Sequence, residues 1–93
     1  PWHPATRQVV GATIEDQTIQ TLQNLQAILE AAGLGMQDVV KTTVHLSDLN
    51  LFPRFNEVYS RFFPDPKPVR TTVGSHLLGI LVEIDLVAYA GQD

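Results

Sequence analysis

The chain has no cysteine among its 93 residues, and no apolar run in it approaches the length of a membrane span. Without cysteine there can be no disulfide, no thiol nucleophile and no thiolate metal ligand, and the composition suits a reducing compartment such as the cytoplasm. A membrane-spanning helix needs about 20 consecutive apolar residues. We therefore expect a cytoplasmic protein that has no membrane partner.

Basic residues are also few. Six Lys and Arg stand against ten Asp and Glu, which gives a net charge of −4, and the basic residues are scattered along the chain. Proteins that bind nucleic acid usually gather basic residues on one face. A nucleic-acid partner is therefore not expected.

Sequence motifs of common catalytic centres and cofactor sites are missing too. The chain has no phosphate loop, no GxGxxG, no nucleophile elbow and no HExxH. Its histidines share no metal-ligand spacing, and each is more typical of a strand or loop residue: His3, His45 and His76. The serines lack a recognisable activating partner: Ser47, Ser60 and Ser75. We expect no metal, no cofactor and no serine nucleophile.

The length suits a single domain over residues 1–93. Residues 1–12 are expected to form a loop or a short edge strand. After them the hydrophobic pattern and the capping signals predict a helix over 13–32, a strand over 39–46, a helix over 51–63, and strands over 69–73 and 80–89. This order predicts an α+β layer with both helices on one face of the sheet.

The same pattern predicts which face each side chain takes. On the first helix the apolar stripe holds Ile14, Leu22, Leu25, Ile28, Leu29 and Ala32, and the opposite side holds Gln17, Gln20, Gln23, Gln26 and Glu30. On the first strand one face holds Val40, Thr42, Val44 and Leu46, and the other holds Val39, Lys41, Thr43 and His45. The polar face of this strand is either solvated or turned toward another subunit.

Three charged residues, Arg70, Glu83 and Asp85, lie in segments that otherwise resemble core strands, where an unpaired charge is costly. Arg70 could hold the carboxylate of a small acid through two parallel hydrogen bonds. It could instead form a structural ion pair with Asp65, Glu83 or Asp85. Glu83 could accept a structural hydrogen bond, or it could position and deprotonate a water. Asn56 is most simply a surface or capping residue.

Several segments taken together resemble one family. They are QTIQTLQNLQAILEAAGLGMQDVVKTTVHLSDLNLFPRFNEVYSRFF (17–63), PVRTTV (68–73) and LVEIDLVA (81–88), and PWHPATRQVVG (1–11) is similar as well. Over nearly its whole length the chain resembles the RidA/YjgF family of reactive-intermediate deaminases, also called L-PSP endoribonucleases. The combination of AAG, DVVKTTV, N-x-x-Y-x-x-FF and VRTTV is specific, whereas each piece alone would be weak.

The resemblance implies a chorismate-mutase-like sheet and a homotrimer whose sheets build a central barrel, with ligand pockets between subunits. It also implies hydrolysis of short 2-imino acids, such as 2-iminobutanoate and 2-iminopropanoate, to 2-oxo acids and ammonia without any cofactor. By this match Arg70 would clamp the substrate carboxylate and the backbone of Thr72 would line that pocket. Glu83 would hold or activate the attacking water, and Asn56 would lie near the pocket.

Relative to the family, the chain begins after an N-terminal hairpin, so we expect an N-terminally truncated sheet that lacks two strands. A non-catalytic trimeric module that binds small carboxylates or a protein partner remains an alternative. A ribonuclease or translation inhibitor is a weaker one, because the acidic balance suits a phosphate backbone poorly.

Overall fold

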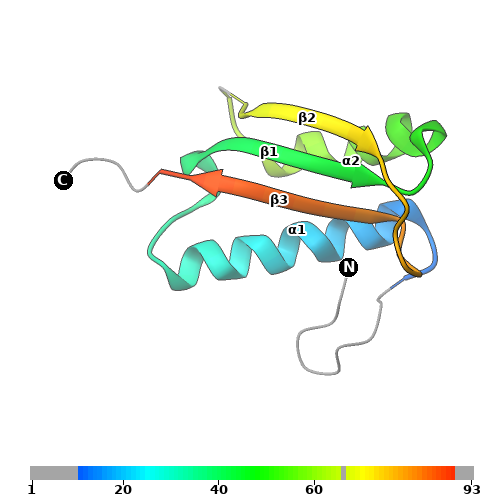
Figure 1. Cartoon of the computed structure of the whole chain (residues 1–93). Helices are drawn as coiled ribbons and strands as arrows, with labels where there is room; N and C mark the ends of the chain where they lie inside the picture. The colour runs from blue at the N-terminus through cyan, green and yellow to red at the C-terminus, as the bar shows by residue number, and fades with distance from the viewer. Residues whose placement is uncertain (1–10, 66, 90–93) are drawn as a thin grey trace.

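Figure 1 shows the computed structural model of the chain, which describes residues 11–65 and 67–89. The elements in order are α1 (Ile14–Ala31), the 3-10 turn η1 (Met36–Asp38), β1 (Val39–Leu46), η2 (Leu49–Leu51), α2 (Phe52–Phe62), β2 (Val69–Gly74) and β3 (Val82–Ala88). The sheet order is β2–β1–β3, with β2 parallel and β3 antiparallel to β1. Both helices lie on one face, as the sequence predicts, and no described helix covers the other. The prediction for residues 1–12 falls almost wholly outside the described residues.

Local signals set both ends of α1. The Thr13 hydroxyl accepts a hydrogen bond from the Asp16 backbone N–H at 3.1 Å, which satisfies one free donor of the first turn. Gly33 follows the helix with φ of 79°, a left-handed conformation that glycine adopts without strain. The Leu34 N–H then donates back to the Leu29 carbonyl at 2.8 Å. The sequence therefore predicted this helix to within a residue or two.

The predicted faces of α1 need three corrections, one of which is that Ala32, expected in the apolar stripe, is exposed. Ile28, expected in the apolar stripe, is 65% exposed, whereas Gln17, expected on the polar side, is 4% exposed. The Gln17 side-chain amide donates to the Gly11 carbonyl at 3.1 Å and accepts from the Leu81 N–H at 2.8 Å. Because both ends of this amide are bonded, its burial costs little. Gln17 therefore ties the start of α1 to the segment that leads into β3.

Near the start of β1 the side chains that point toward the helices are not the predicted ones. Its pairing with β3 is irregular between Val39 and Lys41, and one extra residue in a ladder reverses the alternation on one side of it. Val39 is therefore only 5% exposed and Val40 is 49% exposed, the reverse of the predicted faces. From Thr42 to Leu46 the predicted alternation is correct.

β3 is shorter than the predicted strand over 80–89. The backbone of Leu81 is bonded outside the ladder, because its N–H donates to Gln17 and its carbonyl accepts from the Ser47 N–H at 3.0 Å. The ladder begins at Val82, which lies opposite Leu46.

The core lies between the sheet and the helices. Its buried members are Ile14, Leu22, Leu29, Met36, Val39, Val44, Leu46, Phe55, Tyr59, Phe63, Val82 and Ile84. The rings of Phe55, Tyr59 and Phe63 stack in sequence, with centroids 5.2 and 4.7 Å apart, and fix α2 against the sheet. None of the helices in the described part of the chain is long and apolar enough to cross a bilayer.

An exposed ion pair joins the two helices. Arg54 of α2 donates from Nε and Nη2 to the two carboxylate oxygens of Glu15 in α1, each at 2.7 Å. The hydrogen bonding from Arg54, with a smaller contribution from a backbone N–H, lowers the pKa of Glu15 from 4.5 to about 2. Two parallel bonds make this a better-defined pair than most surface ion pairs.

The pH dependence of stability tests this pair. Because the pKa of Glu15 is lowered in the folded state, the pair stabilises the fold above pH 4.5, and this contribution is lost as the pH falls from 4.5 toward about 2. Over that range we expect urea unfolding of Glu15→Gln to depend less on pH than unfolding of the wild type. Glu57→Gln is the control for loss of one exposed carboxylate, 3.7 Å from Arg61. Equal pH slopes for Glu15→Gln and wild type would contradict the prediction.

Candidate functional site

Arg70 lies on β2, an edge strand of the described sheet. In the parallel pairing it is level with Thr42, whose side chain is fully buried beneath the helices. Residues that are level on neighbouring strands point to the same face. The side chain of Arg70 therefore projects toward α2. It points away from the face of the sheet that no described helix covers, which we call the open face.

Three residues of α2 hold the guanidinium of Arg70, and we call them the arginine cradle: Phe52, Asn56 and Tyr59. Arg70 Nη1 donates a hydrogen bond to Asn56 Oδ1. Arg70 Cζ lies 5.0 Å from the centre of the Phe52 ring and 4.9 Å from that of Tyr59. Their spacing places the three residues on one stripe of the helix. Ring contacts of this kind suit a flat guanidinium better than the ammonium of lysine.

The cradle is anchored to β1 by a buried hydrogen bond. The hydroxyls of Tyr59 and Thr42 lie 2.7 Å apart. Burial raises the pKa of Tyr59, so its phenol stays protonated at neutral pH. Leaving a buried hydroxyl unpaired costs about 1–3 kcal/mol. The ring that supports Arg70 is therefore held in place from the side of the sheet.

A hollow of about 410 Å³ opens beside this guanidinium, lined by Asn56, Tyr59, Ser60, Lys67, Pro68 and Arg70. Its other cation, Lys67, donates to the carbonyls of Ser60 and Phe63 at 3.2 and 3.0 Å and so closes the end of α2. Lys67 also lies 3.8 Å from Asp65. The ammonium of Lys67 thus has hydrogen-bond and ionic partners within its own chain. The guanidinium of Arg70 is the cation of the hollow that lacks a carboxylate partner among the described residues.

Arg70 forms no ion pair with a carboxylate within residues 11–65 and 67–89. The structural ion pairs that the sequence left open, to Asp65, Glu83 or Asp85, are therefore not formed in that part of the chain. A guanidinium has five N–H donors, and within the same residues the one side-chain hydrogen bond of Arg70 goes to Asn56. The arrangement is suited to receiving a small carboxylate.

Thr72 lies two residues beyond Arg70 on the same face of β2, level with the buried Val44. Its hydroxyl is buried and has no hydrogen-bond partner in the described part of the chain. The structure thus joins Arg70 to Asn56 and places Thr72 on the same face of β2, although Thr72 is not among the residues that line the hollow.

Glu83 lies on the other face of the sheet. It is exposed on β3, level with His45, while its neighbours Val82 and Ile84 point into the core. β1 lies between β3 and β2. Within one copy of the chain, the sheet itself therefore separates Glu83 from Arg70.

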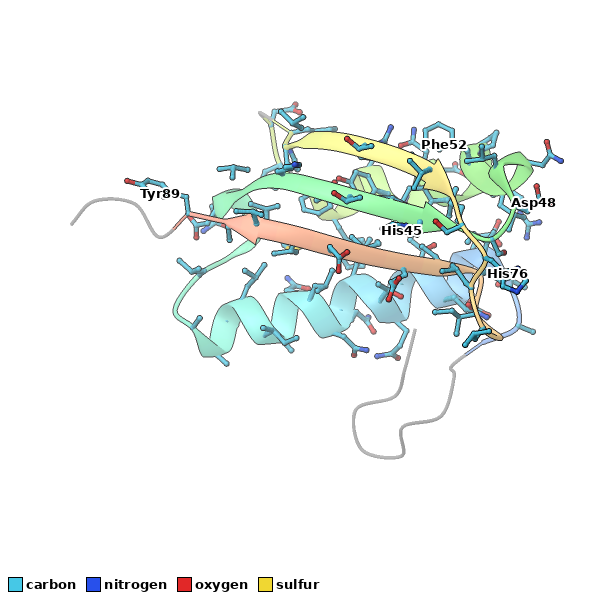
Figure 2. The ribbon with its side chains drawn as sticks, viewed as in Figure 1. His45, Asp48, Phe52, His76 and Tyr89 are labelled. Atoms are coloured by element: carbon cyan, nitrogen blue, oxygen red, sulfur yellow. The ribbon has the colours of Figure 1, made fainter. Side chains whose placement is uncertain are left out.

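One contact on the open face was not predicted from the sequence. His45 Nδ1 lies 2.8 Å from the hydroxyl of Ser75, the residue that follows β2, so this serine does have an imidazole partner. His45 Nε2 lies 3.9 Å from a carboxylate oxygen of Asp85. Figure 2 shows His45 on β1, near the end where β2 runs into its loop. No local sequence pattern predicts the contact between His45 and Ser75, because it depends on the parallel pairing of segments 30 residues apart. No three His, Cys, Asp or Glu residues in the described ranges are grouped so that they could hold a metal ion.

A two-helix α+β domain that presents an arginine from its edge strand has close relatives among known proteins. The family model described as endoribonuclease L-PSP matches residues 1–90. The RutC family protein of Pyrococcus horikoshii is 46% identical over 91 residues, which cover 96% of this chain and 72% of that protein. Reactive Intermediate Deaminase A of the Arabidopsis thaliana chloroplast is 42% identical over 87 residues, 91% of this chain and 46% of that protein.

Solved structures agree with these relatives. The crystal structure of E. coli TdcF with bound serine superposes with a TM-score of 0.89 at 36% identity, covering 98% of this chain and 75% of that one. The chain therefore belongs to the RidA/YjgF family, whose model carries the L-PSP name. That family includes reactive intermediate deaminases.

Proposed function

We propose that this chain hydrolyses short 2-imino acids, of the size of 2-iminobutanoate and 2-iminopropanoate, to 2-oxo acids and ammonia. The observation that carries the proposal is Arg70, a guanidinium held by the arginine cradle, with no carboxylate partner among the described residues, at the wall of a hollow. The relative TdcF holds serine, which has the same α-carboxylate as such substrates. The lack of cysteine is our reason for proposing the cytoplasm as its location.

In this reaction Arg70 would bind the substrate carboxylate, with Asn56 fixing the guanidinium and the backbone of Thr72 lining the pocket. The imine carbon is already electrophilic, so orientation, a placed water and a proton route are sufficient. Water oxygen attacks the protonated imine and forms the C–O bond of a carbinolamine, the C=N electron pair moves to nitrogen, and Glu83 takes a proton from the attacking water. A proton then returns to nitrogen, the C–N bond breaks, ammonia leaves, and the hydroxyl loses its proton as C=O forms.

The positions of Arg70 and Glu83 favour a site that is built from more than one copy of the chain. They lie on opposite faces of the sheet, and the open face that carries Glu83 also exposes Val69, Val73 and Val87 by 70%, 37% and 56%. Several exposed apolar side chains on one face favour an interface. We therefore propose a homotrimer in which the sheets surround a central barrel and each cleft takes Arg70 from one copy and Glu83 from a neighbour.

Ammonia release tests the proposed function. A dehydratase acting on threonine or serine would generate the imine in situ, and the chain should increase the rate of ammonia release above the spontaneous rate. Sedimentation of the same sample should show a trimer. Incubation with single-stranded RNA in parallel should show no cleavage. A trimer that binds 2-oxo acids without accelerating ammonia release would contradict the deaminase and support a binding module.

A further inference from the structure

We infer that His45 is a positioning residue for the proposed hydrolysis, which lies beside Glu83 on the sheet and supplies its carboxylate with the proton that the leaving nitrogen needs. This inference rests on the proposed function and adds to it a residue and a proton source. The residues concerned surround His45 on the open face of the sheet, and none of them belongs to the arginine cradle.

The register of the sheet sets His45 beside Glu83. The two residues are direct partners in the antiparallel pairing of β1 and β3. Side chains of such partners share one face, with Cβ atoms about 4.5–5.5 Å apart. An imidazole on β1 therefore lies within reach of the carboxylate on β3.

The imidazole is also oriented. Its Nδ1 lies 2.8 Å from the Ser75 hydroxyl, and its Nε2 faces β3, where Asp85 Oδ2 lies 3.9 Å away. One ring nitrogen is thus occupied by a neutral group, and the other is directed at Asp85, the neighbour of Glu83 on the same face of β3. The side chain of His45 is 28% exposed, so it can still exchange protons with water.

The charged groups around His45 are of mixed sign. Lys41 shares its face of β1, and Glu83 and Asp85 face it from β3. On the other side β2 offers only Val73, the register partner of His45, and the uncharged Ser75. The acidic groups are therefore the proton-exchange partners that the described structure provides.

The chemistry explains why such a residue is useful. When water attacks the protonated imine, Glu83 accepts one proton, and the nitrogen must gain one before the C–N bond breaks. A carboxyl group ordinarily retains no proton at neutral pH, whereas an imidazole both gives and takes protons there. His45 would return a proton to the nitrogen through Glu83. The hydroxyl proton of the carbinolamine would leave by the same route to solvent, so no further reactant is required.

The test compares His45→Gln with wild type in steady-state ammonia release between pH 5 and 9. We expect kcat to fall at least about tenfold at pH 7 with KM unchanged, because proton transfer is slowed while Arg70 still binds the carboxylate. The pH profile of kcat should differ in shape between the variant and the wild type. Added imidazole should restore part of kcat, an effect that a purely structural histidine would not show.

Two further variants make the outcome decisive. Ser75→Ala keeps the imidazole but frees its Nδ1, and should give a smaller loss of kcat without imidazole rescue. His76→Gln changes the neighbouring exposed histidine (Figure 2) and should leave kcat and the pH profile unchanged. If the wild type hydrolyses the imine and His45→Gln matches it at every pH, the role of His45 is overturned and the deaminase stands. If the wild type does not accelerate ammonia release, both inferences are overturned.

Discussion

Replacing Arg70 by lysine is expected to reduce kcat/KM for a 2-imino acid by about a hundredfold. Lysine keeps the charge but cannot form two parallel hydrogen bonds to a carboxylate. It also loses the contacts that the planar guanidinium makes with the rings of Phe52 and Tyr59. A charge-assisted hydrogen bond contributes about 1.5–3 kcal/mol, and each 1.4 kcal/mol changes a rate tenfold. Arg70→Ala should remove activity altogether.

These variants should remain folded. Arg70 lies on an edge strand and pairs with no carboxylate in the described part of the chain, so its removal breaks no buried ion pair. Arg61→Lys on α2 is the matched control, since its guanidinium is exposed and lies 3.7 Å from Glu57. Thermal unfolding should give nearly the wild-type Tm for both lysine variants. A large drop in Tm with unchanged kcat/KM would instead assign Arg70 a structural role.

Mixing two inactive variants is expected to restore activity. Arg70→Ala and Glu83→Gln should each lose most of the wild-type rate as pure trimers. Because the sheet separates these residues within one copy, a cleft between copies can still combine an intact Arg70 with an intact Glu83. A mixed cyclic trimer has one complete cleft out of its three, whichever variant supplies two of the copies. Purified mixed trimers should therefore show about a third of the wild-type rate.

The mixed trimers would be prepared by co-expression with two different affinity tags and purified on both tags in succession. A mixture of two differently tagged Arg70→Ala chains is the control and should remain inactive. Absence of recovery in a doubly tagged, correctly assembled trimer would mean that both residues act from the same copy. That result would contradict the two-copy site while leaving Arg70 as the carboxylate clamp.

Much of the fold was predictable because its signals are local. The Thr13 cap, the Gly33 terminus and the alternation from Thr42 to Leu46 each depend on a few adjacent residues. The errors occur where a distant partner decides the outcome. Val39 and Val40 exchange faces because of an irregular pairing with β3, and Gln17 is buried because the backbone of Leu81 bonds to it.

In the candidate site, too, some residues could be predicted from the sequence, whereas the positions of others depend on distant partners. Arg70, Thr72 and Asn56 could be proposed from family resemblance, and the structure places them together on the helix-covered side. That Glu83 lies on the opposite face follows only from the order and register of three strands. The contact between His45 and Ser75 likewise requires the parallel pairing of β1 with β2, which no local pattern in either strand reveals.

The side-chain amide of Gln17 also limits how this chain can vary. One residue supports both Gly11, just before α1, and Leu81, two positions before Glu83. A shorter or longer loop between β2 and β3 would move Leu81 away from this amide and leave buried polar groups unpaired. The reach of Gln17 therefore sets the permitted length of that loop, and changes in loop length are expected to occur together with a change at position 17.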